Sequence, residues 1–270
     1  MRKAAVLGFP INHSLSPAIH NAAYRNLGFK GSYSAHEVRA EELKPFLAEQ
    51  KSDAEWIGFS LTMPLKEEIC RIAKDVDIEV DQRSLRISSA NTLHRVGNTW
   101  RATSTDVTGF QYLFSQRELG EIALLGAGGT ARAAIEALPN DTKEVVIYRR
   151  SQERDDALRN AFPERKLQFQ NWQDIESAWM FTTVINTVPM SACIEAARSF
   201  RSPTLLIDSL YSPWLPPFSQ RQSEESGDLI TGVDLLCAQA LDQIRFMTGE
   251  NFDNDEMFHF LKEEALKHVK

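Results

Sequence analysis

A short apolar run that breaks into glycines and continues at once in helix-forming residues constrains the fold of this chain most. The run is Ile122-Ala-Leu-Leu-Gly-Ala-Gly-Gly-Thr-Ala-Arg-Ala-Ala134, and it predicts a strand, a tight turn and a helix. Gly126 would permit the turn, Gly128 would let a pyrophosphate approach the backbone, and Ala131 stands in the place of a third glycine. Amides that open a helix attract anions. The alternative is a glycine turn that binds no nucleotide.

The end of the next predicted strand, residues 145–148, indicates which dinucleotide would fit. An NAD site places an acidic residue there, about 20 residues after the first glycine. This chain instead has Arg149, Arg150, Ser151 and, slightly later, Arg154. Guanidinium groups suit a phosphate monoester, so the pattern favours NADP. The alternative is a solvated basic turn, although cations are disfavoured where a helix begins.

Strands and helices alternate along most of the chain, which predicts an α/β fold. The first half contains predicted strands at 4–9, 32–38 and 56–63, with a helix from Pro17 to Leu27. In the second half, the strands at 167–169, 184–188 and 204–208 predict a parallel sheet, and residues 213–217 an irregular surface loop. Helices are expected from Val233 onward and from about Asn254.

The loop His13-Ser-Leu-Ser-Pro17 precedes the first predicted helix. Ser16 is placed to cap that helix and Pro17 to occupy its first turn, whereas capping gives no reason for Ser14. Two hydroxyls beside a helix N-terminus could bind a carboxylate. A plain cap and turn is the other interpretation.

Lys66 falls in the first turn of a helix that follows the predicted strand at 56–63. The helix dipole opposes a cation there by about 0.3–1 kcal/mol, so the position calls for a reason. The alternative is a solvated lysine whose charge Glu67 and Glu68 offset.

Two strands, 86–94 and 98–104, are predicted to form a hairpin around Gly97 and Asn98. Thr105 or Asp106 would then cap the following helix, and this role alone would explain an aspartate at that position.

Charge and cysteine usage exclude several classes of protein. The 270 residues include 30 Lys and Arg against 37 Asp and Glu, a net charge of −7, which argues against a nucleic acid partner. Cys70, Cys193 and Cys237 are odd in number and lack a CxxC pair, so we expect neither a disulfide framework nor a metal site. The N-terminus leads into a strand and no apolar run reaches the length of a membrane span, so we expect a cytoplasmic protein with no membrane partner.

These features occur in one order along nearly the whole chain, and together they resemble the shikimate dehydrogenase family. The motifs that carry the resemblance are Pro10-Ile-Asn-His-Ser-Leu-Ser-Pro-Ala-Ile-His-Asn21, Gly58-Phe-Ser-Leu-Thr-Met-Pro-Leu-Lys66, Ala90-Asn-Thr92, Ser104-Thr-Asp106, Gly126-Ala-Gly-Gly-Thr-Ala-Arg132, Arg149-Arg-Ser151 with Arg154, Asp208-Ser-Leu-Tyr211 and Gly232-Val-Asp-Leu-Leu-Cys-Ala-Gln239.

The resemblance implies a role for each matching residue. Lys66 and Asp106 would be the catalytic pair. Substrate would be held by Ser14, Ser16, Thr62, Asn91, Tyr211 and Gln239. NADP would be held by Gly126, Ala127, Gly128, Gly129, Thr130, Ala131, Arg149, Arg150, Ser151 and Arg154.

The implied fold has two α/β domains. Residues 1–105, joined by the C-terminal helices at 239–270, would bind substrate, and residues 106–238 would form a Rossmann-type NADP domain. The implied activity is the reversible NADPH-dependent reduction of 3-dehydroshikimate to shikimate, in aromatic amino acid biosynthesis. The partner would be this small molecule, and the protein would be a monomer or a homodimer.

Several positions depart from the family pattern. Ser60, Ser104 and Arg149 each stand where the family usually has asparagine, Pro216 replaces a customary threonine, and Asn186-Thr-Val-Pro-Met190 is shortened. These departures keep open a relative that acts on quinate or another hydroxylated cyclic acid. A second alternative is an NADP-binding sensor without catalysis.

Overall fold

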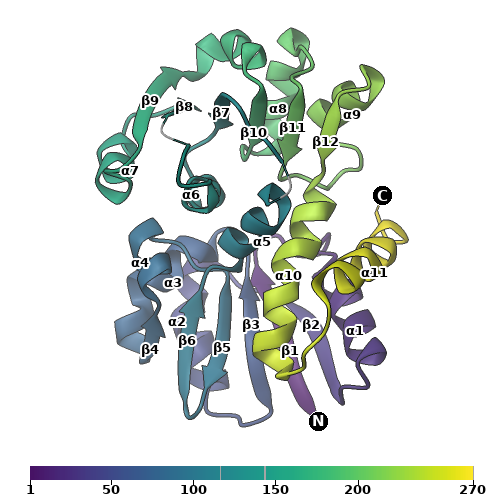
Figure 1. The fold of residues 1–270 in the computed structure, drawn as a ribbon. Coiled ribbons are helices and arrows are strands. Elements are labelled where there is room, and N and C mark those ends of the chain that lie inside the picture. Colours follow the sequence, from purple (N-terminus) through teal and green to yellow (C-terminus); the bar gives the residue numbers. More distant parts are fainter. Residues whose placement is uncertain (116, 143, 270) are drawn as a thin grey trace. The chain divides into compact units, whose positions relative to one another are not determined.

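The computed structural model describes residues 1–115, 117–142 and 144–269. The chain divides into two compact units (Figure 1). Residues 1–109 and 236–268 form the first unit, and residues 110–235 make up most of the second. Each unit contains one six-stranded sheet with helices, so the predicted α/β class is confirmed. The expected domain boundaries at 105/106 and 238/239 fall inside α5 (Thr105–Phe114) and α10 (Gly232–Thr248), which each run from one unit into the other.

The first unit is built around a mixed sheet of order β2-β1-β3-β5-β6-β4. Strand β5 is antiparallel to both its neighbours, and the other pairs are parallel. The elements are β1 (Arg2–Gly8), α1 (Ser16–Asn26), β2 (Gly31–Glu37), α2 (Ala40–Gln50), β3 (Trp56–Leu61), α3 (Leu65–Ile72), η1 (Ala73–Val76), β4 (Ile78–Val80), α4 (Gln82–Ile87), β5 (Thr92–Val96), β6 (Thr99–Thr103), the start of α5, most of α10 and α11 (Asn254–Leu266).

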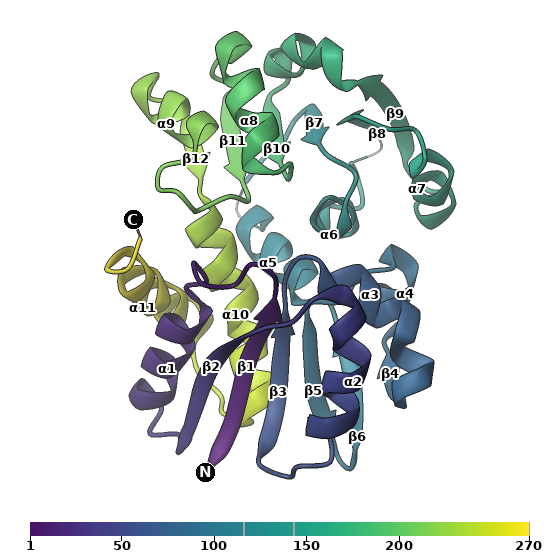
Figure 2. The same cartoon turned by 180° about the vertical axis from the view of Figure 1, so that it is seen from behind.

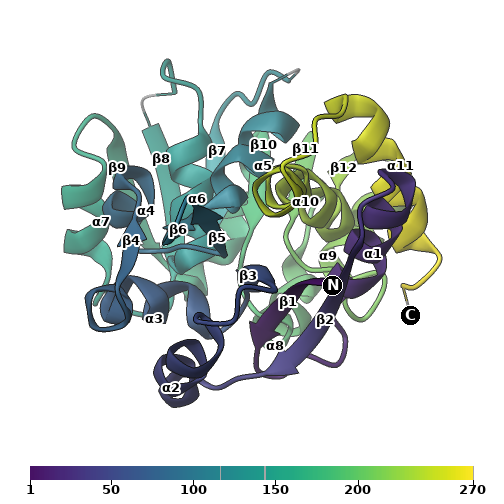
Figure 3. The same cartoon turned by 90° about the horizontal axis from the view of Figure 1, so that it is seen from below.

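Helices cover both faces of this sheet. Figures 1 and 2, taken from opposite sides, show α10 over one face and α2 over the other, and Figure 3 shows the same layers from below. Successive strand residues point to opposite faces. Accordingly, Ala5 and Leu7 of β1 belong to the core cluster that includes residues of α2 and α3, while Ala4 and Val6 pack in the cluster that contains Met247 of α10. A central strand buried on both faces is expected to be almost continuously apolar, as β1 is from Ala4 onward.

The second unit contains a fully parallel sheet of order β12-β11-β10-β7-β8-β9. This is the doubly wound dinucleotide-binding order, in which the strand sequence reverses direction between β7 and β10. Its elements are the end of α5, β7 (Ile122–Leu125), α6 (Gly129–Ala137), β8 (Glu144–Arg149), α7 (Asp155–Ala161), β9 (Lys166–Asn171), η2 (Trp172–Met180), β10 (Thr183–Asn186), α8 (Met190–Ala196), η3 (Ala197–Ser199), β11 (Leu205–Asp208), α9 (Pro217–Glu224) and β12 (Asp228–Ile230).

One predicted strand boundary is wrong. The first strand of the hairpin begins at Thr92, because residues before it form α4, which Asp81 caps by accepting a hydrogen bond from the Ser84 amide at 2.7 Å. The predicted irregular loop at 213–217 is confirmed for residues 213–216, whereas Pro217 opens α9, because proline is well tolerated in the first turn of a helix. Within the described ranges, no helix is both long and apolar enough to cross a membrane.

Candidate active site

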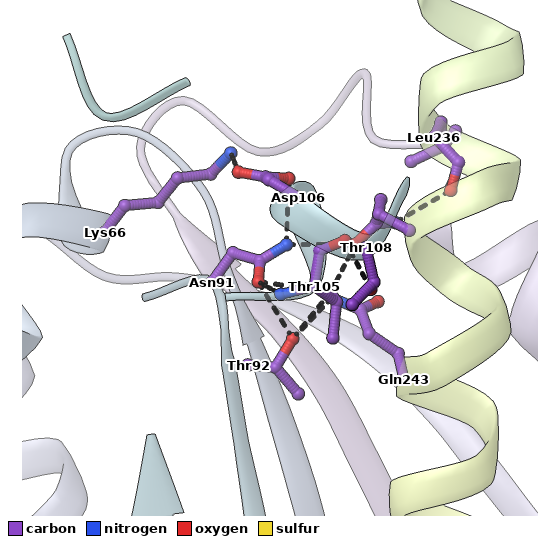
Figure 4. A network of polar contacts seen from close by, with 9 residues as sticks. Lys66, Asn91, Thr92, Thr105, Asp106, Thr108, Leu236 and Gln243 are labelled. Atoms are coloured by element: carbon purple, nitrogen blue, oxygen red, sulfur yellow. Dashed lines mark hydrogen bonds and ion pairs between the residues drawn. The ribbon is translucent and has the colours of Figure 1, made fainter. Parts of the chain in front are cut away.

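Lys66 and Asp106 form an ion pair in the first unit (Figure 4). Lys66 lies in the first turn of α3, just after β3, and Asp106 lies in the first turn of α5. Lys66 Nζ is 2.5 Å from Asp106 Oδ2, and the side chains are 21% and 6% exposed. The carboxylate is therefore buried against a cation that remains partly accessible.

The other oxygen of Asp106 accepts a hydrogen bond from Asn91 Nδ2 at 2.9 Å. The same nitrogen lies 3.1 Å from Gln239 Oε1 on α10. Four of the predicted residues, Lys66, Asn91, Asp106 and Gln239, are thus joined in one network. The prediction that Thr105 or Asp106 caps this helix is wrong, because α5 already begins at Thr105. The Thr105 hydroxyl and both carboxylate oxygens of Asp106 face other partners.

Thr92, Thr105 and Gln243, which lie outside the predicted set, extend this network. Asn91 Oδ1 accepts hydrogen bonds from the Thr105 amide at 2.7 Å and from the hydroxyls of Thr105 and Thr92, each at 3.1 Å. Gln243 Nε2 donates to Thr92 Oγ1 at 3.0 Å. Gln243 lies four residues after Gln239, on the same face of α10, and that spacing is the signal that could have identified it.

Ser14 and Ser16 lie where α1 begins, but their capping roles are the reverse of those predicted. Helical backbone already starts at Leu15, which makes Ser16 the first residue of α1, and no side chain caps the helix from that position. The Ser16 amide instead donates to Ser14 Oγ at 3.3 Å. Ser14 is half-buried and Ser16 is buried. Thr62, which is also half-buried, directly follows β3.

In the second unit, the predicted glycine turn joins β7 to α6. Gly126 has a φ of +105°, and a Cβ there would lie 2.6 Å from Thr187 Oγ1, so the turn requires glycine. Gly128 precedes α6 and no side chain caps the helix, which leaves its first amides for an anion. Gly129 and Thr130 open the helix and Ala131 is buried in it. This backbone fits the pyrophosphate of a dinucleotide.

The arginines after β8 separate into two kinds. Arg150 and Arg154 are exposed, and Arg154 Nη1 donates to the carbonyl of Ala127 at 3.3 Å, which keeps it beside the glycine turn. Ser151 Oγ accepts a hydrogen bond from the Glu153 amide. These cations fit the 2′-phosphate that distinguishes NADP from NAD.

Arg149 is buried and its guanidinium is occupied by protein groups. It donates to Asp155 Oδ1 at 3.0 Å, to Asp155 Oδ2 at 2.8 Å and to Asn171 Oδ1 at 2.8 Å. The Asp155 carboxylate raises the pKa of Arg149. Arg149 therefore ties the end of β8 to the start of α7 and to the end of β9.

Tyr211, half-buried, follows β11 on a segment that Asp208 fixes. Asp208 Oδ1 accepts hydrogen bonds from the Leu210 amide at 3.0 Å and from Asn186 at 2.9 Å, and Oδ2 accepts from Ser219 at 2.8 Å. Burial raises the pKa of Asp208. These bonds hold the backbone that leads into Tyr211.

Of the positions that depart from the family pattern, Ser60 has a clear structural role. Its hydroxyl accepts a hydrogen bond from Tyr33 Oη at 2.6 Å, and the Tyr33 ring stacks on His20 with centroids 4.1 Å apart. Ser104 Oγ is buried, with no hydrogen-bond partner in the part of the chain that the structure describes.

Known proteins match this chain over most of its length. A sequence model of the shikimate dehydrogenase substrate binding domain matches residues 6–93. The NADP(+) shikimate dehydrogenase of Xylella fastidiosa strain Temecula1 is 32% identical over 96% of this chain and 95% of its own. Among solved structures, Mycobacterium tuberculosis shikimate dehydrogenase has a TM-score of 0.86 at 30% identity and covers 97% of this chain and 100% of its own. The shikimate 5-dehydrogenase of Thermus thermophilus, in complex with NADP(H) and shikimate, has a TM-score of 0.82 at 29% identity, with 100% of each chain covered.

Proposed function

The chain belongs to the shikimate dehydrogenase family, and we propose that it reversibly reduces 3-dehydroshikimate to shikimate with NADPH, in aromatic amino acid biosynthesis. The observation that carries the proposal is the Lys66–Asp106 pair, in which the carboxylate is buried and the lysine is partly accessible, with Asn91 bonded to the other carboxylate oxygen. Such a pair suits proton transfer to a carbonyl oxygen.

In this proposal, NADPH supplies the hydride when it is bound. Lys66 Nζ donates a proton to the substrate oxygen as negative charge develops there, and it takes that proton back in the reverse reaction. Asp106 holds the lysine in place from its buried position. Because the Lys66 side chain is 21% exposed, its remaining protons can reach a ligand.

We assign substrate binding to the residues that surround this pair in the sequence motifs. Ser14 and Ser16 would hold the carboxylate with their hydroxyls and the first amides of α1. Asn91 and Gln239, already joined by a hydrogen bond of 3.1 Å, would contact substrate hydroxyls. Thr62 and Tyr211 would add further contacts.

We assign NADP binding to the second unit. The glycine turn from Gly126 to Ala131 would hold the pyrophosphate, and Arg150, Ser151 and Arg154 the 2′-phosphate. Arg149 would support these residues through Asp155 rather than touch the cofactor.

The corresponding domain roles are substrate binding for residues 1–105 with 239–270 and NADP binding for residues 106–238. We further propose that the enzyme works in the cytoplasm, as a monomer or a homodimer.

The proposal is tested by steady-state kinetics with shikimate and NADP. Lys66→Ala should lower kcat by roughly 10²–10⁴-fold, the usual contribution of general acid–base catalysis, and leave the Kd for NADP unchanged. Lys44→Ala is the matched control, because Lys44 also pairs with an aspartate, Asp75, at 2.9 Å but on the exposed surface. Normal turnover by folded Lys66→Ala would refute the assignment.

Substrate and cofactor choice are tested with the same assay. Wild type should turn over shikimate faster than quinate and prefer NADP to NAD. Faster quinate turnover would instead favour the related hydroxylated cyclic acid. NADP binding without turnover of either acid would indicate a sensor.

A further inference from the structure

A series of hydrogen bonds connects α10 to the buried carboxylate of Asp106 (Figure 4), and in each bond the donor lies on the side nearer to α10. Gln243 Nε2 donates to Thr92 Oγ1 at 3.0 Å, Thr92 Oγ1 donates to Asn91 Oδ1 at 3.1 Å, and Asn91 Nδ2 donates to Asp106 Oδ1 at 2.9 Å. An amide nitrogen can only donate, so the Thr92 oxygen accepts from Gln243, and its single proton is left for Asn91 Oδ1 or for Thr105 Oγ1, each 3.1 Å away.

The direction of this series determines how Asn91 meets Asp106. A reversed Asn91 amide would present an oxygen to the carboxylate, and two acceptors repel each other. Donors at Asn91 Oδ1 prevent that reversal. Gln243, Thr92 and Asn91 are 1%, 0% and 2% exposed, so no solvent water readily replaces a lost donor. Buried hydrogen bonds in which each acceptor group is also the donor of the next bond polarise and strengthen one another.

The far side of Gln243 faces His20. His20 Nδ1 donates to the Ser16 carbonyl at 2.9 Å, which leaves Nε2 as an acceptor, and within the described residues neither Nε2 nor Gln243 Oε1 has a hydrogen-bond partner. Turning the Gln243 amide around would give His20 Nε2 a donor but would draw the Thr92 proton away from Asn91. The orientation of this one amide therefore decides whether Thr92 donates to Asn91.

We propose that Gln243 is a positioning residue for the Lys66–Asp106 pair: its amide fixes the Thr92 hydroxyl, and Thr92, together with the amide and hydroxyl of Thr105, holds Asn91 with its N–H toward Asp106. The inference rests on the proposed catalytic role of that pair.

Two nearly isosteric variants test the donor. Gln243→Met removes the amide, and Gln243→Glu keeps the shape and an acceptor but removes the N–H. Each should lower kcat about 5- to 20-fold, the effect of one buried hydrogen bond expressed in the transition state, while the KM for shikimate and the Kd for NADP change less than about twofold. Normal kcat in Gln243→Met would show that no donor is needed at this position and would overturn the proposal.

A matched control separates positioning from general stability. Gln222 is also a buried glutamine, and it donates to the carbonyls of Pro203 at 3.0 Å and Asp228 at 2.9 Å in the second unit. Gln222→Met should lower the Tm but leave kcat unchanged. If Gln243→Met likewise lowers the Tm and leaves kcat normal, its role is merely structural and the proposal fails.

Thr92 provides a test that does not depend on how Gln243 variants fold. Thr92→Val should lower kcat as Gln243→Met does, and Thr92→Ser, which keeps the hydroxyl, should restore it. The double variant Thr92→Val with Gln243→Met should be little worse than the slower single variant, because both interrupt one series of bonds. Additive losses would overturn the proposal.

Lys66→Ala, measured in the same series, distinguishes this inference from the function on which it rests. An inactive Lys66→Ala beside a normal Gln243→Met overturns only the positioning role. Normal turnover in both overturns the proposed function as well.

Discussion

Replacing Arg149 with methionine distinguishes the two roles that this residue could have. Arg149 stands in the motif that resembles an NADP site, yet its guanidinium bonds to Asp155 at 2.8 Å and to Asn171 at 2.8 Å. The Arg149 and Asp155 side chains are only 7% and 11% exposed. Methionine would fill most of the volume of the side chain, but it would leave the Asp155 carboxylate buried without its cation.

The expected magnitude follows from that burial. Removing one member of a buried ion pair costs roughly 3–5 kcal/mol, because the remaining charge is uncompensated. Asp155 keeps a little solvent contact and lies in the first turn of α7, where the helix dipole favours an anion, so we expect about 3 kcal/mol. Replacing both partners, with Arg149→Met and Asp155→Leu, should recover most of the loss.

Urea denaturation of the ligand-free protein measures this free energy of unfolding, and titration with NADP and NAD measures the two affinities. We expect a large loss of stability in Arg149→Met, and a preserved preference for NADP in the double variant. An unchanged stability, together with weaker binding of NADP but not of NAD, would refute the reasoning. That result would show that Arg149 contacts the 2′-phosphate directly.

Three further predictions concern single positions. Burial lowers the pKa of His20 from 6.5 to about 4, so the unfolded chain binds more protons between these values. Keeping the ring neutral contributes about 3 kcal/mol to the free energy of unfolding, and this contribution is complete above pH 6.5 and is lost as the pH falls through 4. Urea denaturation at a series of pH values should show that the free energy of unfolding falls less with decreasing pH in His20→Phe than in the wild type. Gly126→Ala should weaken NADP binding at least about tenfold, because the new Cβ would lie 2.6 Å from Thr187 Oγ1 at a φ of +105°. Gly97→Ala, at a turn where nothing lies within 4 Å of the new Cβ, should leave NADP binding unchanged. Ser14→Ala should raise the KM for shikimate more than it lowers kcat, since contacts to a non-reacting group act equally in both states, and an unchanged KM would exclude Ser14 from the carboxylate site.

The parallel sheet of the second unit could be predicted from the sequence because its signals are local. An apolar strand, a glycine turn and an uninterrupted helix occupy adjacent residues from Ile122 onward, so no distant contact is needed to recognise them. The pattern at Arg149 is equally local but incomplete. The predicted 2′-phosphate site takes into account Arg149, Arg150, Ser151 and Arg154, whereas the acid that binds Arg149 is Asp155, six residues later on α7.

The network around Asp106 could be predicted only in part. The motifs that resemble the family contain Lys66, Asn91, Asp106 and Gln239, but the spacing of these residues along the chain does not reveal which atoms meet. Thr92 and Gln243 are 151 residues apart, and their contact depends on how α10 packs against the sheet. The capping roles of Ser14 and Ser16 are reversed because α1 begins at Ser16, one residue earlier than predicted. The Ser16 amide is then one of the first helical amides, and Ser14 Oγ accepts its hydrogen bond.

The discontinuity of the first unit has a consequence for synthesis of the protein. Asn91 and Gln239 are separated by 148 residues, so at about 5–20 residues per second the glutamine is translated roughly 7–30 s after the asparagine. Residues 1–109 leave the ribosome long before α10 does. During that interval the strands of the first unit can pair, but the hydrogen bonds that join Asn91 and Thr92 to α10 cannot form until α10 has been translated.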